Sequence, residues 1–274
     1  MNTKHKNITI LSSKLLAKLS EGGKSWFTIK QVYDLFPELS KKSVVQQLIM
    51  MTNAGILLRI QEGLYYIIPY EQDSQTFMPD WHLLAEPLVG GEHYIGYYSA
   101  LQIHNLITQP SLKEQIVVNK RIKTSEKTIK GVDFQFIYHN EKHFFGYKKT
   151  WIDSFNKVLC SDLEKTITDC LYKPDYAGGI VEIAKAILMS KDKIKYEQLM
   201  NYVVKFDSQS VIKRLGYLLE LLSISTPIIE GLQKLRTNSI TVLDTEIPKQ
   251  GKILSRWSIQ QNVDIETIKN AITT

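Results

Sequence analysis

Apolar residues in the first part of the chain recur at the three- to four-residue spacing of amphipathic helices. Three helices are expected, over Thr9–Ser20, from Thr28 to Pro37, and from Ser40 to Ala54-Gly55. Thr28 and Gln31 have the spacing of a capping box, and Ser40 is a favourable N-cap residue. The side chains expected to face the core are Val32, Leu35 and Phe36 in the second helix and Val44, Leu48 and Met51 in the third.

After Gly55 the pattern changes to that of strands. Ile56–Ile60 and Leu64–Ile68 are rich in β-branched, leucine and aromatic residues, and Gln61-Glu62-Gly63 between them suits a tight turn. Helices followed by a hairpin in this order are typical of a winged helix-turn-helix. We therefore expect residues 1–70 to form a winged helix-turn-helix that binds double-stranded DNA.

The net charge of +6 is concentrated in this segment. Residues 1–70 contain nine Lys and Arg against four Asp and Glu, which leaves +5, whereas the other 204 residues contain 25 against 24. Lysine and arginine that neutralise phosphates and release counterions supply much of the affinity of proteins for DNA. The charge distribution therefore favours a nucleic-acid partner for the N-terminal segment.

In a winged helix-turn-helix the third helix enters the major groove. The candidate DNA-binding residues are Lys41, Lys42, Ser43, Gln46 and Gln47 on this helix and Arg59 beside the hairpin turn. The amide of Gln46 suits adenine, whereas Lys41 and Lys42 suit phosphate or guanine. The alternative is that the same fold serves protein contact and that this face is only solvated.

Residues 71–80 have no hydrophobic period and end in Pro79-Asp80, so a linker is expected there. Residues 81–274 are expected to form a mixed α+β domain with an antiparallel sheet, because polar and apolar residues alternate in its strands. The expected strands are Gln115–Asn119, Val132–Tyr138, His143–Tyr147, Ser239–Leu243 and Ile253–Ile259. The expected helices are Tyr97–Leu106, one capped by Ser161 and Glu164 that ends at Lys173-Pro174, Ile180–Met189, Tyr196–Lys205, Ser210–Leu222 and one from Asp264.

A basic stretch joins two of the expected strands. Lys120, Arg121 and Lys123 begin a segment in which Glu126 is the one acidic residue. A solvated loop is the simpler interpretation, and Lys120, Arg121 and Lys123 are candidates for a second nucleic-acid contact.

Candidate catalytic and metal-binding residues are sparse. His139 and His143 are four residues apart on an expected strand-to-strand turn, with no third ligand beside them. Asp162, Glu164 and Asp169 could form a carboxylate cluster, but Glu164 is already expected to cap a helix. We therefore expect no catalytic residue, no metal site and no cofactor, and the chain is not expected to be an enzyme.

Cysteine and hydropathy patterns indicate the compartment. Cys160 and Cys170 are expected at opposite ends of one helix, about 15 Å apart, which is too far for a disulfide. No apolar run approaches the roughly 20 residues of a membrane-spanning helix. The start of the chain lacks the apolar region of a signal peptide. A cytoplasmic protein with no membrane partner is expected.

Three stretches of the chain resemble segments of a known protein family. They are Tyr94–Leu101 followed by His104 and Leu106; Leu163–Leu171 followed by Pro174, Tyr176, Gly178 and Gly179; and Gly63-Leu64-Tyr65 in the hairpin. Together they resemble AbiEi-like antitoxins, over roughly residues 9–225. The order of these motifs carries the resemblance more than any single motif does.

The resemblance implies a type IV toxin–antitoxin, or abortive-infection, system. In such antitoxins the winged helix binds inverted repeats in the promoter of their own operon and represses it. The second domain is implicated in neutralising a nucleotidyltransferase-like toxin encoded next to the antitoxin, with or without a stable complex. Two other functions stay open from the residues: a winged-helix regulator whose second domain senses a ligand or dimerises, and a nucleic-acid-processing enzyme with a DNA-binding module.

Overall fold

The computed structural model of the chain describes residues 9–21, 23, 25–107 and 109–273. The chain divides into two compact units, Met1–Gly90 and Gly91–Thr274. Both units combine helices with a β-sheet, so the expected mixed α+β class is confirmed.

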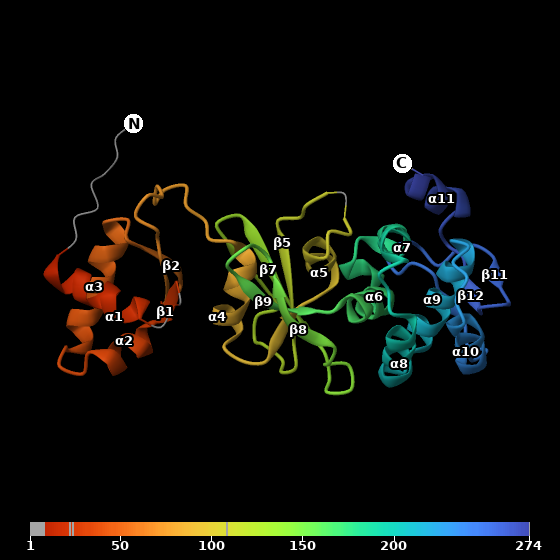
Figure 1. Ribbon diagram of the computed structural model, residues 1–274, viewed down its shortest axis with the longest axis horizontal. Helices are drawn as coiled ribbons and strands as arrows, with labels where there is room; N and C mark the ends of the chain where they lie inside the picture. Colours follow the sequence, from red (N-terminus) through yellow and green to blue (C-terminus); the bar gives the residue numbers. More distant parts are fainter. Residues whose placement is uncertain (1–8, 22, 24, 108, 274) are drawn as a thin grey trace. The chain divides into compact units, whose positions relative to one another are not determined.

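The first unit follows the expected order of three helices and a hairpin. Its elements are α1 (Ile10–Ser20), β1 (Trp26–Thr28), α2 (Ile29–Leu35), α3 (Lys41–Asn53), β2 (Leu57–Gln61) and β3 (Leu64–Ile67), of which all but β3 are labelled in Figure 1. The short strand β1 was not expected. It pairs antiparallel with β3, which also pairs antiparallel with β2, so the three-stranded sheet has the order β1-β3-β2.

Side-chain caps fix the starts of all three of these helices, with Thr9 as the cap of α1. The hydroxyl of Thr28 accepts a hydrogen bond from the Gln31 N–H, and the Gln31 side chain accepts one from the Thr28 N–H at 2.7 Å, which confirms the capping box. Ser40 caps α3 by accepting a bond from the Ser43 N–H at 3.1 Å. These bonds satisfy amide groups that a helix start would otherwise leave unpaired.

The core of the first unit contains most of the expected side chains. Val32, Phe36 and the expected residues of α3 are buried in one cluster, whereas Leu35 is 39% exposed. The expectation that Leu35 faces the core was therefore wrong. Val32 and Phe36 are four residues apart and form the buried stripe of this two-turn helix, which leaves Leu35 at the edge of the stripe.

The boundary between the units lies further along the chain than the expected linker. Residues 71–80 contact the first unit: Ser74 lies against Gly55, and the Phe77 ring lies 5.9 Å from that of Tyr66. The short helices η1 (Trp81–Leu84) and α4 (Ala85–Val89) follow, and the division falls after Gly90. The sequence-based boundaries at 70 and 81 missed this because a segment without hydrophobic period can still pack through single aromatic residues.

Six strands of the second unit form one sheet. They are β4 (His93–Ile95), β5 (Lys113–Val118), β6 (Glu126–Ile129), β7 (Val132–Tyr138), β8 (Tyr147–Trp151) and β9 (Lys157–Ser161). Their order is β6-β7-β5-β4-β9-β8, and the β5–β7 and β4–β9 pairs are parallel. The sheet is therefore mixed, and the expectation of an antiparallel sheet was wrong. Alternation of polar and apolar residues along a strand indicates which face of the sheet is exposed to solvent, but it does not indicate whether the neighbouring strand is parallel or antiparallel.

The expected strand His143–Tyr147 was also wrong, since only Tyr147 belongs to β8. Gly146 has a φ of +72°, a left-handed conformation that interrupts an extended strand. A Cβ at Gly146 would also lie 2.9 Å from Cβ of Lys165, so the close approach of α6 needs glycine there.

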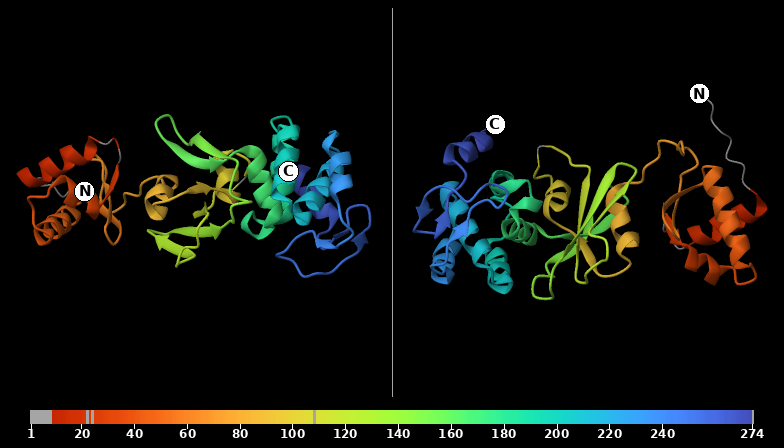
Figure 2. Two further views of the ribbon diagram at one scale, coloured as in Figure 1. Left: turned by 90° about the horizontal axis from the view of Figure 1, so that it is seen from below. Right: turned by 180° about the vertical axis from the view of Figure 1, so that it is seen from behind.

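The helices after β9 gather beside this sheet in both views of Figure 2. The helices and turns of the second unit are α5 (Tyr97–Ile103), α6 (Leu163–Tyr172), η2 (Pro174–Tyr176), α7 (Gly179–Ser190), α8 (Tyr196–Phe206), α9 (Gln209–Leu221), α10 (Ile228–Leu235) and α11 (Ile265–Thr273). Of these, α10 was not expected. A small sheet has the order β10-β12-β11 and consists of β10 (Thr241–Val242), β12 (Ile259–Gln260) and β11 (Ile253–Leu254).

Both cysteines are buried free thiols, as expected, but Cys160 lies in β9 and only Cys170 in a helix. Among the residues that the structure describes, none of the helices combines the length and the apolar character needed to cross a membrane.

Candidate nucleic-acid interface

The candidate interface is the face of α3 that points away from the core. Val44, Leu48 and Met51 are buried at the spacing of one helical stripe and hold α3 in the first unit. The side chains between them are therefore directed outward. Helix α3 contains no Asp or Glu.

Four expected DNA-binding residues are exposed near the start of α3: Lys41, Lys42, Ser43 and Gln46. The ammonium of Lys41 lies 5.7 Å from the ring centre of Tyr33, an exposed cation–π contact. The hydroxyl of Ser43 shares a hydrogen bond of 2.8 Å with the hydroxyl of Ser40. Ser43 is thus exposed, but its hydroxyl already has a partner within the helix cap.

Gln47, which the sequence placed at the interface, faces the interior instead. Its side chain is buried, and Nε2 donates a hydrogen bond of 2.7 Å to Oγ of Ser12 and a longer one to Oγ1 of Thr9. The expectation that Gln47 lies on the outward face of α3 was therefore wrong. A polar residue one position before the buried Leu48 falls on the core stripe, and α1 supplies the partners that make its burial tolerable.

Sequence reasoning also missed two residues of the outward face. Val45 and Ile49 are exposed beside Gln46, and so is Met50. Val45 is three residues and Ile49 seven residues after Lys42, and this spacing was the available signal, because positions i, i+3 and i+7 share a helix face.

Arg59 is exposed on a different element, the strand β2. It pairs in register with Tyr65 of β3, and the hairpin turns at Glu62-Gly63. Gly63 has a φ of +71°, as a tight turn requires, and its carbonyl accepts a bond from the Ile29 N–H at 2.8 Å. That bond ties the hairpin to the start of α2.

The three residues of the second expected basic contact belong to the second unit. Lys120, Arg121 and Lys123 lie between β5 and β6 and are exposed. The guanidinium of Arg121 lies 5.3 Å from the ring centre of Tyr138. The structure does not bring these residues together with α3 in one unit.

A buried polar network in the second unit was not foreseen. Lys165 and Asp169 form an ion pair one turn apart on α6, and neither side chain has any exposed surface. The hydroxyl of Tyr94 donates to Asp169 at 2.9 Å and accepts from the Lys165 ammonium at 2.9 Å. The ammonium also lies 5.2 Å from the ring centres of Phe145 and Phe206. Burial lowers the pKa of Lys165, and Asp169 counteracts that effect.

His139 extends this network toward α5. The hydroxyl of Tyr97 lies 2.7 Å from Nε2 of His139, and the hydroxyl of Tyr94 lies 3.2 Å from Nδ1. Because the one hydroxyl proton of Tyr94 goes to Asp169, Nδ1 carries the ring proton and Nε2 accepts from Tyr97. Burial lowers the pKa of His139 to about 2, so the ring is neutral. The backbone of Tyr97 has a φ of +52°, a conformation that residues other than glycine rarely adopt.

The acidic residues Asp162, Glu164 and Asp169 accept hydrogen bonds from groups of α6, Tyr94 and Lys195. Asp162, and not the expected Ser161, caps α6 by accepting from the Lys165 N–H at 2.9 Å. Glu164 accepts from the Lys195 N–H at 2.8 Å and is not a capping-box partner. Asp162 and Asp169 thus both contact Lys165, through its backbone N–H and its ammonium group respectively, whereas Glu164 contacts the start of α8.

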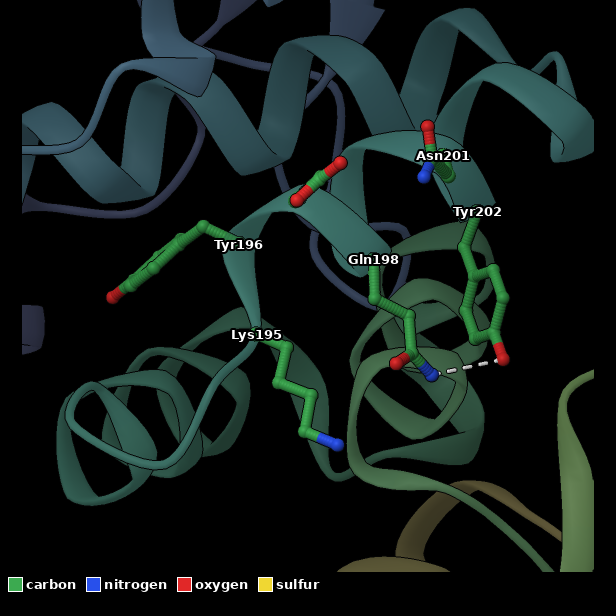
Figure 3. A pocket seen from close by; sticks show the side chains of 6 residues that line it. Lys195, Tyr196, Gln198, Asn201 and Tyr202 are labelled. Atoms are coloured by element: carbon green, nitrogen blue, oxygen red, sulfur yellow. Dashed lines mark hydrogen bonds between the residues drawn. The ribbon is translucent and has the colours of Figure 1, made fainter.

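A shallow cleft of about 710 Å³ lies at the start of α8 (Figure 3). It is lined by Lys195, Tyr196, Glu197, Gln198, Asn201 and Tyr202. At its floor the amide of Gln198 donates to the Tyr202 hydroxyl at 3.0 Å, and both donate to Asp162. Gln198, Tyr202 and Asp162 therefore satisfy one another's hydrogen-bonding groups at this cleft.

Comparison with known proteins gives the fold but no family. No protein-family model matches the chain, and no curated protein matches it. The crystal structure of the RV2827C protein from Mycobacterium tuberculosis is similar, with a TM-score of 0.72 at 12% sequence identity. The match covers 98% of this chain and 96% of that one. The two chains therefore share a fold along nearly their whole lengths.

Proposed function

We propose that the first unit is a winged helix-turn-helix that binds double-stranded DNA, and that the chain represses transcription of its own operon and acts as an antitoxin. The observation that carries DNA binding is the exposed, cationic start of α3. Lys41 and Lys42 occupy the first two positions of the helix. The helix macrodipole disfavours lysines at a helix start. A bound phosphate would interact favourably both with the lysine ammonium groups and with the free backbone N–H groups of the first turn.

The other exposed candidates fit the same role. Gln46 lies one turn after Lys42, where the first turns of a recognition helix meet base edges. Arg59 on β2 is available to a phosphate or the minor groove. Lys120, Arg121 and Lys123 are a second candidate contact from the other unit.

The experiment is a titration of the full chain against a duplex from its own promoter at several salt concentrations. Lys42→Ala is expected to weaken binding and to reduce the slope of log affinity against log salt by about 1. Lys14→Ala removes an equal charge from the exposed side of α1 and serves as the control. Equal slopes for the two variants would exclude α3 as the DNA-binding helix.

The antitoxin part of the proposal is supported by the resemblance to AbiEi-like antitoxins. The two longer stretches that carry it, Tyr94–Leu101 and Leu163–Leu171, contact each other through the bonds of Tyr94 with Lys165 and Asp169. They therefore behave as one feature of the second unit and not as two independent similarities.

Co-expression with a nucleotidyltransferase-like protein encoded beside this gene tests the antitoxin role. The chain is expected to restore growth. A Lys42→Ala, Gln46→Ala double variant should still restore growth while a reporter under the operon promoter is derepressed. Failure of the unaltered chain to protect would remove the antitoxin role and leave a transcriptional regulator.

A further inference from the structure

The outward face of α3 is apolar in its middle. Val45 is 38% exposed, Ile49 is 51% exposed and Met50 is 47% exposed. They follow Lys42 along the helix and flank Gln46, the one amide on this part of the face. A recognition helix that read only guanine or phosphate would gain nothing from aliphatic side chains here.

One group on the major-groove edges of the bases is apolar, the C5-methyl of thymine. Aliphatic side chains cannot hydrogen-bond to base edges, so removal of apolar surface from water is what they contribute on binding. We propose that Val45 and Ile49 read thymine by contact with this methyl group. The inference rests on the proposed DNA binding and names the base that the site selects.

Gln46 gives the same selection a polar component. A glutamine amide can accept from N6 of adenine and donate to N7. Because adenine pairs with thymine, one A·T pair can meet both kinds of side chain. Its adenine edge bonds with the amide, and its thymine methyl contacts a neighbouring aliphatic side chain. Val45 and Ile49 are four residues apart, about 6 Å along the helix axis, or roughly two base-pair rises. The half-site read by α3 therefore contains adjacent A·T pairs.

A second copy of this chain is the competing occupant of the apolar face. A symmetric contact between two α3 helices would bring four lysines, Lys41 and Lys42 from each copy, into one interface, with no acidic residue on α3 to offset their charge. Duplex DNA instead brings phosphates to these lysines while the aliphatic side chains enter the groove. Charge complementarity therefore favours DNA.

The test begins with duplexes that the full chain selects from a randomised pool. Thymines in the selected half-site are then replaced one at a time by deoxyuridine, which removes the methyl group and keeps the base pairing. We expect about fourfold weaker binding for each contacted methyl, the factor that corresponds to ~0.8 kcal/mol. Substitution of thymines outside the half-site is the control and should leave the affinity unchanged.

For each of the variants Ile49→Ala and Val45→Ala, there should be one thymine position at which replacement by deoxyuridine no longer lowers the affinity. At that position the thymine methyl has already lost the side chain that it contacts. Both side chains are partly exposed, so these variants are expected to fold. If the chain selects a duplex but deoxyuridine changes nothing, thymine reading is overturned and DNA binding stands. If the chain selects no duplex, both fail. A change of oligomeric state in Ile49→Ala without any change in base preference would assign the face to self-association and overturn the inference.

Discussion

Nε2 of Gln47 lies 2.7 Å from Oγ of Ser12, and this hydrogen bond joins α3 to α1 inside the first unit. The preceding residue, Gln46, is exposed on another side of α3. Two adjacent glutamines thus have different roles, one in holding the helix and one at the surface.

The pair gives a direct separation of stability from binding. Gln47→Ala should lower the free energy of unfolding of the first unit by ~1–3 kcal/mol, because Ser12 loses a buried partner. Gln46→Ala should change it by less than ~0.5 kcal/mol, as surface substitutions do. Calorimetry measures both, and equal losses would contradict the burial of Gln47. In DNA titrations of the folded proteins, only Gln46→Ala should alter base preference.

The contact between Gly216 and Trp257 predicts a second contrast. A Cβ on Gly216, in α9, would overlap the indole of Trp257, which a bond from Nε1 to Glu220 at 2.8 Å holds in place. Gly216→Ala should therefore destabilise the second unit by ~1–3 kcal/mol through overpacking. In α10, Gly231→Ala meets only the flexible end of Met200, at 2.8 Å, and should gain up to ~1 kcal/mol of helix propensity. Denaturant unfolding of both variants measures the change in the free energy of unfolding. Similar changes in the two variants would contradict a rigid contact at Gly216.

The neutral, buried ring of His139 predicts that acid destabilises the second unit. Its pKa falls from the ordinary value of 6.5 to about 2 in the folded chain. Below pH 6.5 the unfolded chain therefore takes up a proton that the folded chain does not. The free energy of unfolding should fall by up to ~1.4 kcal/mol for each pH unit between those two pKa values.

His139→Gln is the variant that isolates this effect. The amide can accept from Tyr97 and donate to Tyr94 but does not titrate. Between pH 7 and pH 5 the variant should lose less stability than the unaltered chain. Burial also lowers the pKa of His104 and of His143, so part of the slope should persist in both proteins. Identical slopes would show that His139 is not the buried neutral ring described here.

We expect substitution of the buried Arg214 to destabilise the protein more than substitution of an exposed arginine. Its guanidinium donates to the carbonyls of Leu171, at 2.7 Å, and Val242, at 2.8 Å, and so joins the end of α6 to β10. Arg214→Lys loses the planar fork that reaches both sides, and should cost ~2–4 kcal/mol. Arg256→Lys, at an exposed ion pair with Glu220, should leave the unfolding temperature nearly unchanged, because solvent screens exposed ion pairs. Thermal unfolding of the two variants gives the comparison, and equal effects would contradict the structural role of Arg214.

Local signals made the first unit predictable. The capping box of Thr28 with Gln31 and the cap at Ser40 mark helix starts in the sequence itself, and the structure has both. The buried stripe of α3 follows from spacing alone. What spacing did not reveal was Gln47, because the partner that permits its burial, Ser12, comes from a different helix.

The sheet of the second unit was less predictable because its pairing is distant in sequence. The central strand β4 has only three residues and pairs with β9 at Ile95 and Cys160. A strand this short carries no period that alternation can reveal. The network of Lys165 and Asp169 was missed for a related reason, since their partners Tyr94 and His139 come from other elements.

The parallel pairing of β4 with β9 has a consequence for synthesis of the chain. Until residues 157–161 leave the ribosome, β4 has β5 on one side and an open hydrogen-bonding edge on the other. His93, Tyr94 and Ile95 are all buried in the finished sheet, so the nascent chain exposes an edge strand that is otherwise in the centre. Such edges pair readily with other chains. Slow translation between β4 and β9 would therefore lengthen the period in which the protein can aggregate.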